Sequence, residues 1–305
     1  MNKKKAIQLI KIFVLLLVFV FIGRYLYKNI NELKKLEIKI NFSVFIISMI
    51  TFWIYKLANA FLWHYITLLA KCSIPVEKAV IAWMYSLLWK FIPGKVFYLG
   101  GRLYFYHNEG ISKTKISFCF IFENICTLVA AAFLFIVSLI FVNVDFLNKY
   151  KYISVFLLVL FFIIINPYFF KTGINLLLKI FRKEPLQLVI SYMDILKVVS
   201  LFILNWIILG FGFYLLVNSI YPVHTGEFFF ITGTYALACI IGILSLFAPS
   251  GIGVRESIIV IALKIIIPES VTIVISIVSR IWATAGELFL VLLTFIYAKF
   301  RRIKM

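Results

Sequence analysis

Charged residues are scarce in this sequence, and their scarcity excludes most soluble proteins. Only 14% of the 305 residues are charged, whereas 64% are hydrophobic and 18% are aromatic. A soluble domain of this composition would have too few polar side chains to cover its surface. Continuous apolar stretches of about 18 or more residues, enough to cross a bilayer as a helix, recur along the chain. The sequence therefore predicts an all-α, polytopic membrane protein, and the lack of apolar/polar alternation excludes a β-barrel.

Residues suited to metal, redox or nucleotide chemistry are few and scattered. The four cysteines have no CxxC or Cys/His spacing, so we expect buried free thiols at positions 72, 119, 126 and 239. The three histidines are far apart, at positions 64, 107 and 224. No GxxxxGK[ST] motif is present, which argues against a nucleotide-driven step. We expect neither a metal nor another cofactor.

Acidic residues are also few, with 12 Asp and Glu against 31 Lys and Arg, and the formal net charge is +19. In a soluble protein such an excess would indicate a nucleic-acid partner. Here the basic residues do not form an aromatic-interleaved patch on a soluble module, so we expect no nucleic-acid binding. Most of the excess is assigned to loops that face lipid headgroups.

Six apolar segments predict membrane spans, and two more are interrupted. Spans are expected at about 6–27, 43–70, 115–142, 152–167, 192–218 and 271–299. The first is interpreted as an uncleaved span because no small-residue cleavage site follows it. Residues 78–107 are broken at Pro93-Gly94, and residues 227–266 at Pro249 to Gly253. Arms of about fourteen residues reach only about 20 Å, so each broken segment predicts a re-entrant hairpin.

The order span, span, hairpin, span occurs twice within what we expect to be a single transmembrane domain, residues 1–305, without a soluble domain. The first repeat covers about 6–142 and the second about 152–299. An odd number of crossings per repeat would invert the second copy relative to the first, as in many transporters. Residues 227–247, the longer first arm of the second hairpin, could instead span the membrane.

The distribution of basic residues predicts cytoplasmic termini. The N-terminal segment and the basic segments 171–184 and 299–304 then lie inside, while 218–227, which has no Lys or Arg, lies outside. The loop 28–39, with four Lys and two Glu, does not follow this rule. We expect a multi-pass protein of the cell (plasma or inner) membrane.

Charged residues at membrane depth gather around the two breaks. New half-helices are expected at about Lys95 and Val254, with their free N–H groups and positive dipole ends inside the membrane, and Ser250 could cap the second. A charge at the bilayer centre costs about 2.5–3.5 kcal/mol, so this clustering predicts an anion-binding site with an excess of two positive charges. The candidate residues are Lys90, Pro93, Gly94, Lys95, Tyr98, Arg102, Glu123, Pro249, Ser250, Gly251, Gly253, Arg255, Glu256, Arg280 and Glu287.

A structural interpretation of the same charges stays open. Arg255–Glu256 and Arg280–Glu287 could be ion pairs that only hold helices together. Other polar residues in the spans receive a simpler interpretation. Lys56, like Lys11 and Lys264, is expected to extend toward the headgroups or to pair locally, and His64 to be a core histidine.

The motifs at the two breaks resemble a known family. IPGKVFYLGGR (92–102), FENICTLVAAAFLF (122–135), FAPSGIGVRES (247–257) and the last span with Arg280 are similar to the transmembrane region of lysylphosphatidylglycerol synthase/flippase proteins, over about 10–300. In two places the chain departs from the family pattern. It has Glu123-Asn124 where the family often has Glu-Arg, and Pro249-Ser250-Gly251 where the family often has Pro-Gly-Gly. The matching positions are Pro93, Gly94, Gly101, Arg102, Glu123, Pro249, Gly251, Gly253 and Glu256.

This resemblance implies a function in lipid transport. Family members with a fused cytosolic domain attach lysine to phosphatidylglycerol and move the product between leaflets. No such domain is recognised here, so the resemblance implies the translocating half alone, a flippase for an anionic or phosphate-headed lipid rather than an enzyme. The absence of the Glu-Arg cation implies a different preferred headgroup.

Three alternatives remain open at this point. The first is a transporter of a polyprenyl-phosphate or lipid-linked glycan carrier. The second is a non-catalytic partner of a separate lipid-modifying enzyme or glycosyltransferase. The third is a membrane lipid transferase or phosphatase, which the scattered histidines and carboxylates disfavour.

Overall fold

The computed structural model describes residues 39–89, 96–141, 191–245 and 253–301, together with Tyr152 and Phe156, and these ranges are helical with short connections. No strand occurs within them, which confirms the all-α class. The helices are α2 (Phe42–Leu69), α3 (Val76–Trp89), α4 (Val96–Asn108), α5 (Lys113–Phe141), α9 (Tyr192–Ile220), the 3₁₀ turn η1 (Thr225–Glu227), α10 (Phe228–Leu244), α11 (Val254–Leu263) and α12 (Glu269–Phe300).

Five helical segments among the described residues are long and apolar enough to cross a membrane. Four of them, α2, α5, α9 and α12, match the predicted spans 43–70, 115–142, 192–218 and 271–299 within a few residues. The fifth, Thr225–Leu244, is the first arm of the second hairpin. The predicted spans 6–27 and 152–167 lie outside the described residues, apart from Tyr152 and Phe156. The total number of crossings therefore stays a prediction.

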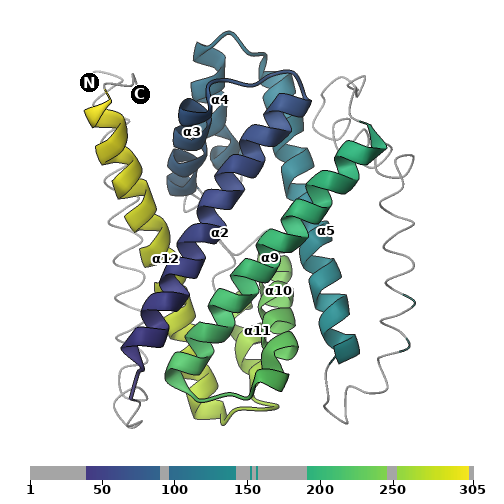
Figure 1. Ribbon diagram of the computed structural model, residues 1–305, viewed down its shortest axis with the longest axis vertical. Coiled ribbons are helices and arrows are strands. Elements are labelled where there is room, and N and C mark those ends of the chain that lie inside the picture. Colours follow the sequence, from purple (N-terminus) through teal and green to yellow (C-terminus); the bar gives the residue numbers. More distant parts are fainter. Residues whose placement is uncertain are drawn as a thin grey trace.

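The two broken segments form two helix pairs at opposite ends of the molecule. Helix α3 packs against α4, and α10 packs against α11. Figure 1 shows α3 and α4 in the upper half and α10 and α11 in the lower half, so the two pairs approach the middle from opposite sides. The second arms begin at Val96 and Val254, within one residue of the predicted starts. The breaks themselves, 90–95 and 246–252, lie outside the described residues.

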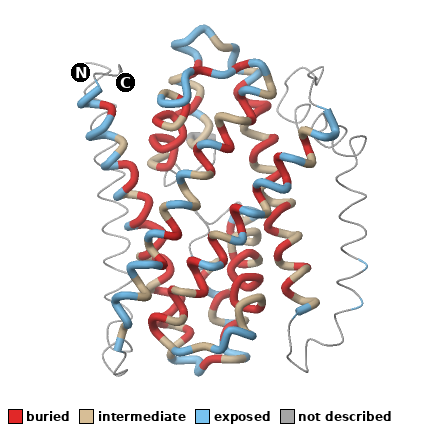
Figure 2. Tube along the Cα trace, viewed as in Figure 1, coloured by how far each residue is buried: buried red, intermediate tan, exposed pale blue. Residues whose placement is uncertain are grey.

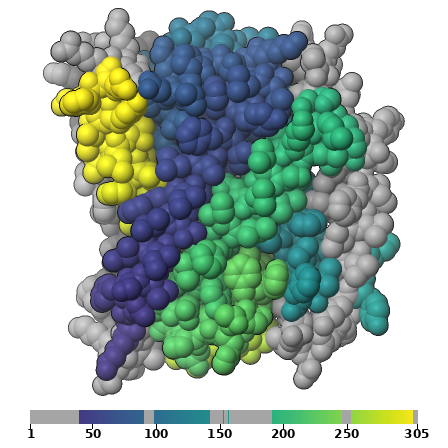
Figure 3. Space-filling view, viewed as in Figure 1, coloured from purple at the N-terminus to yellow at the C-terminus, as the bar shows by residue number. Residues whose placement is uncertain are grey.

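Helix contacts in the two halves of the chain correspond to each other. Helix α5, which follows the first helix pair, packs against α10 of the second pair, and α12, which follows the second pair, packs against α3 of the first. Helices α2 and α9 pack along each other and cross one face of the molecule side by side (Figure 3). Two copies related by a two-fold axis would have such reciprocal contacts. The repeat boundaries themselves stay a prediction.

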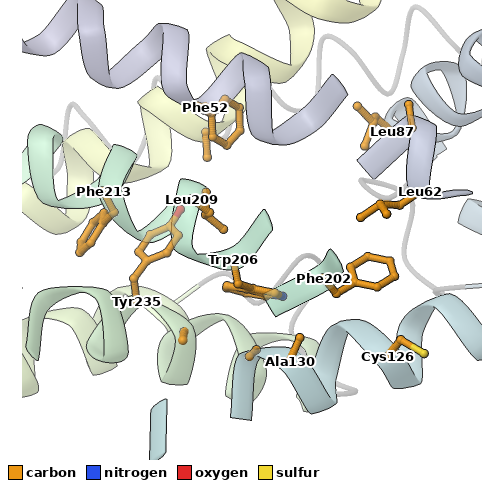
Figure 4. Close-up of a cluster of buried hydrophobic side chains, with 14 of the residues drawn as sticks. Phe52, Leu62, Leu87, Cys126, Ala130, Phe202, Trp206, Leu209, Phe213 and Tyr235 are labelled. Atoms are coloured by element: carbon orange, nitrogen blue, oxygen red, sulfur yellow. The ribbon is translucent and has the colours of Figure 1, made fainter. Parts of the chain in front are cut away.

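Small residues bring these helices close together, as expected where lipid supplies no hydrophobic force between helices. The Ser48 hydroxyl on α2 donates a hydrogen bond to the Gly212 carbonyl oxygen of α9 over 2.7 Å. Around this contact lies a core of aromatic and aliphatic side chains that includes Phe52, Trp206 and Tyr235 (Figure 4). Exposed large apolar residues lie on the outer faces, for example at Ile46, and buried residues line the inside (Figure 2).

The α5–α10 contact depends on Gly233, and a methyl group there is expected to destabilise the fold. A Cβ at this position would lie 1.8 Å from Oγ and 2.3 Å from Cβ of Ser138, so the helices would have to separate. We expect Gly233→Ala to cost about 1–3 kcal/mol, seen as a lower thermal unfolding midpoint in detergent. Gly100→Ala is the control, because nothing lies within 4 Å of its added Cβ. An equal midpoint for the two variants would contradict the close packing.

Candidate functional site

A cavity of about 340 Å³ lies where the two helix pairs meet, a volume typical of small-ligand sites. Each of the eight α-helices in the described part of the chain contributes at least one residue to its wall. Four of the predicted site residues are among them: Tyr98, Glu123, Arg255 and Glu287. Residues from the second arms of both hairpins and from the spans that follow them therefore share one cavity.

Arg102 lies behind this wall, on α4, with its side chain fully buried. Its guanidinium pairs with the Glu123 carboxylate of α5, donates to the Tyr98 hydroxyl over 2.8 Å and donates through Nε to the Ser86 hydroxyl over 3.3 Å. It also packs over the ring of Trp63, with its Cζ 4.1 Å from the ring centroid. Every nitrogen of the guanidinium thus has a protein acceptor, as a buried cation requires.

Glu123 is held on two sides. One oxygen accepts from Arg102, and the other accepts from the Trp83 indole nitrogen of α3 over 2.9 Å. Because Glu123 lines the cavity and Arg102 does not, the arginine acts on the cavity through the carboxylate that it orients. Arg102 is therefore a positioning residue: it orients the Glu123 carboxylate and links α4 to α5.

A second cross-helix pair joins the other hairpin to the span that follows it. Arg280 of α12 pairs with Glu256 of α11 over 3.5 Å. The polarity is the reverse of the first pair, since here the hairpin carries the acid and the span carries the base. In each half of the chain, therefore, one buried ion pair links the second arm of the hairpin to the next span.

Glu256 also occupies the amino-terminal end of α11. Its carboxylate accepts a hydrogen bond of 2.7 Å from the backbone N–H of Gly253, whose φ of 84° suits glycine. The negative side chain offsets the positive end of the helix dipole. The helix end alone is thus a weaker anion site than the sequence predicts, and the neighbouring side chains gain in importance.

Arg255 is a half-buried cation of the cavity wall with spare hydrogen-bonding capacity. Its Nη2 donates to the Tyr235 hydroxyl, and its guanidinium packs over the Tyr235 ring at 4.6 Å. Within the described ranges, no carboxylate lies within 4 Å of it, and its Nε is buried without a hydrogen-bond acceptor. Arg255 lines the cavity, and a cation with unused hydrogen-bonding capacity beside a cavity is suited to an anion.

Lys56 is a site residue that the sequence interpretation missed. It lines the cavity from α2 and pairs over 2.6 Å with Glu287 of α12, and 13% of its side chain is exposed. The expectation that Lys56 extends to the headgroups or pairs locally is wrong, because its partner lies 231 positions away in sequence (287 against 56). A lone lysine in the middle of an apolar span was the signal that could have identified it.

The charges around the cavity leave one positive charge in excess among the described residues. Three cations are matched with three carboxylates as Arg102–Glu123, Arg280–Glu256 and Lys56–Glu287. Arg255 is the fourth cation. The predicted excess of two included Lys90 and Lys95 and did not include Lys56. Seven predicted site residues lie outside the described residues, namely Lys90, Pro93, Gly94, Lys95, Pro249, Ser250 and Gly251.

The other residues with reactive side chains lie outside the cavity wall or contact other groups. Cys72 and Cys119 are buried free thiols with their sulfur atoms 3.5 Å apart, and Cys126 is also a buried free thiol. Within the described ranges, no group of three His, Cys, Asp or Glu side chains could hold a metal ion.

Comparison with known families finds a match that covers most of the chain. A family described as the lysylphosphatidylglycerol synthase TM region matches residues 8–290. That range contains both helix pairs and every residue of the cavity wall. Comparison with curated proteins finds no match.

Proposed function

We propose that this chain, which belongs to the family of the lysylphosphatidylglycerol synthase transmembrane region, moves a lipid with an anionic phosphate headgroup between the two leaflets of the membrane. The family supports a membrane protein that handles lipids. The observation that carries the finer proposal is Arg255, a cation without a described carboxylate partner in a cavity between two oppositely directed helix pairs. We propose that its guanidinium binds the headgroup phosphate.

In this proposal the cavity opens toward lipid where the end of α10 lies near the middle of α5. Asn124 and Thr127 of α5 are half-buried and line the cavity, and Ile243 near the end of α10 is 36% exposed. In this proposal the headgroup enters past these residues while the acyl chains stay in the hydrocarbon. The lipid is moved without a chemical change, so the chain acts as a translocase rather than as an enzyme.

The charge of the two ends of the molecule supports cytoplasmic placement of the α4–α5 connection. Among the described residues, the end formed by the α2–α3 and α4–α5 connections, the start of α9 and the end of α12 carries Lys71, Lys78, Lys113, Lys115, Lys197, Lys299 and Arg301 against Glu77, Glu109 and Asp194. The opposite end carries Lys39 and Lys264 against Glu227 and Glu269. By the positive-inside rule the first end is cytoplasmic.

This orientation predicts which engineered cysteines are accessible on intact cells. Lys113→Cys and Gly226→Cys replace exposed residues at the two ends. A membrane-impermeant maleimide is expected to label Gly226→Cys on intact cells and Lys113→Cys only after lysis. The wild-type chain, whose described cysteines are buried or half-buried, gives the background. The reverse labelling pattern would show that the protein has the opposite orientation in the membrane.

Reconstitution tests the translocase proposal directly. Vesicles of phosphatidylcholine would carry a trace of acyl-labelled phosphatidylglycerol or a labelled polyprenyl phosphate, and a membrane-impermeant reductant would quench the outer leaflet. We expect the protein to speed the exposure of inner-leaflet label for at least one of these phosphate-headed lipids, and mass spectrometry to recover the lipid unchanged. Transfer no faster than in protein-free vesicles for both lipids would refute the proposal. A chemically altered lipid would indicate an enzyme instead.

A further inference from the structure

Five aromatic side chains line the cavity, and most of their rings already contact one of the protein's own cations. The guanidinium carbon of Arg102 lies 4.8 Å from the ring centroid of Tyr98 and 5.4 Å from that of Phe120. The Lys56 ammonium lies 5.4 Å from the ring centroid of Tyr55. Aromatic rings bind a ligand ammonium through the same cation–π attraction. On these rings, however, a ligand ammonium would lie beside Arg102 or Lys56 and be repelled.

The carboxylates of the cavity wall are also engaged with cations. Glu123 pairs with Arg102, and Glu287 pairs with Lys56 over 2.6 Å. A ligand ammonium would have to displace one of these cations to gain a carboxylate partner. With Arg255, the described wall and the residue behind it hold three cations against two carboxylates. This charge balance favours a headgroup with one negative charge and without an ammonium group.

The wall also carries uncharged polar side chains, namely Asn59 of α2 and Asn124 and Thr127 of α5. Asn59 donates through Nδ2 to the Tyr55 carbonyl oxygen over 3.0 Å. Asn124 donates through Nδ2 to the Phe120 carbonyl oxygen over 2.7 Å. Each amide has a second N–H and an oxygen, so these contacts orient the amides without using all of their hydrogen-bonding capacity. Amide and hydroxyl groups, which both donate and accept, match the hydroxyl groups of a ligand.

Trp206 adds an unsatisfied donor to this wall. It lies in the middle of α9, lines the cavity and is only 3% exposed. Within the described part of the chain, its indole Nε1 is buried without a hydrogen-bond acceptor. A buried N–H without an acceptor carries a desolvation cost that a ligand oxygen can remove. Because an indole N–H only donates, it favours an oxygen over an ammonium group.

We propose that the cavity selects a lipid phosphate diester whose second substituent is an uncharged polyol or sugar, and that Trp206 donates a hydrogen bond to a hydroxyl oxygen of this substituent. This inference rests on the proposed function and names the substrate class of the same site. Arg255 binds the phosphate, and the amides of Asn59 and Asn124 bind further hydroxyl groups. A headgroup that ends in an ammonium, such as ethanolamine, is disfavoured by the excess positive charge.

Binding of short-chain lipids tests the headgroup class separately from transport. The purified protein would be kept in a polyoxyethylene detergent, which has no sugar headgroup of its own, and titrated calorimetrically. One matched pair is dihexanoyl phosphatidylglycerol with dihexanoyl phosphatidylmethanol, which lacks the hydroxyl groups. For a polyprenyl source, the pair is farnesyl phosphoglucose with farnesyl methyl phosphate. Dihexanoyl phosphatidylethanolamine supplies the ammonium headgroup.

We expect at least one hydroxyl-bearing lipid to bind about 2- to 10-fold more tightly than its methyl counterpart, the effect of one added neutral hydrogen bond. The pair with the larger difference identifies the source of the headgroup. Phosphatidylethanolamine should bind at least about tenfold more weakly than phosphatidylmethanol, because its ammonium meets like charges. If both members of each pair bind equally, or phosphatidylethanolamine binds as tightly as phosphatidylmethanol, the headgroup class is wrong.

The variant Trp206→Phe tests the indole donor, because phenylalanine keeps an aromatic ring and lacks the N–H. We expect the preference for the hydroxyl-bearing lipid to disappear, while the affinity for its methyl counterpart stays close to that of the wild type. The matched control is Trp53→Phe, which removes an indole N–H that also lacks an acceptor within the described ranges but is not part of the cavity wall. This control should keep the preference. An equal loss of affinity for both lipids in Trp206→Phe would overturn the role of Trp206.

Vesicle transfer separates this inference from the proposed function. Selective binding of a hydroxyl-bearing lipid without any transfer would refute only the translocase. Transfer of phosphatidylethanolamine as fast as that of phosphatidylglycerol and of the phosphosugar lipid would refute only the headgroup class. If none of the lipids binds, both the phosphate site at Arg255 and the headgroup class are wrong.

Discussion

Replacement of Arg102 by alanine is expected to destabilise the folded chain by about 3–5 kcal/mol, because it leaves the buried Glu123 carboxylate without its cation. The arginine side chain is fully buried and joins α4 to α5 through that carboxylate. Its removal also takes away the donors to Tyr98 and Ser86 and the packing over Trp63. The effect should appear as a large fall in the unfolding midpoint of the purified protein in detergent.

A double substitution separates the buried charge from the packing. In Arg102→Met with Glu123→Gln, neither charge remains, and the glutamine can still accept from the Trp83 indole. We expect this variant to recover most of the lost stability, to within about 1–2 kcal/mol of the wild type. If the Arg102→Ala variant is as stable as the wild-type protein, the Arg102–Glu123 pair does not stabilise the packing of α4 against α5.

Replacement of Arg255 by glutamine is expected to slow headgroup transfer by about 10- to 150-fold while leaving stability close to that of the wild type. A hydrogen bond to a charged group contributes about 1.5–3 kcal/mol, and in the proposed complex the guanidinium bonds the phosphate directly. In the structure described here its hydrogen-bond partner is the Tyr235 hydroxyl, and no described carboxylate within 4 Å loses a cation when Arg255 is replaced. Replacement of Arg102 should therefore lower mainly the stability, whereas replacement of Arg255 should lower mainly the transfer rate.

The matched control is Lys264→Gln, which removes one positive charge from the other end of α11. Lys264 is exposed and is not part of the cavity wall. The Lys264→Gln variant is expected to transfer lipid at the wild-type rate, both at low and at physiological salt concentration. If both glutamine variants slow transfer equally, the loss reflects overall charge and not a phosphate site at Arg255.

Much of the architecture could be predicted from the sequence because hydrocarbon permits so few solutions. Unpaired backbone groups cannot face lipid, so long apolar runs must be helices and a Pro-Gly break must lie inside the protein. This reasoning placed α2, α5, α9 and α12 within a few residues and the second arms at Val96 and Val254. The same cost of isolated charge identified Glu123, Arg255 and Glu287 as residues that meet at one place.

The partners of those charges could not be predicted from the sequence. Helical spacing relates Arg280 to Glu287 on one face of α12, and adjacency relates Arg255 to Glu256. The structure pairs Arg280 with Glu256 and Glu287 with Lys56, across different helices. Which side chains meet depends on the rotation and depth of each helix, and these are set by contacts such as Ser48–Gly212 that leave no periodic signal.

By itself, therefore, the sequence determined that this is a helical membrane protein with two interrupted segments and buried charge, because the cost of polar groups in hydrocarbon acts on each residue separately. Only the tertiary structure decided that Arg102 positions a carboxylate, that Lys56 belongs to the cavity, and that Arg255 keeps spare hydrogen-bonding capacity. Those roles depend on distances between helices far apart in the chain, and such distances follow from how all the helices pack together.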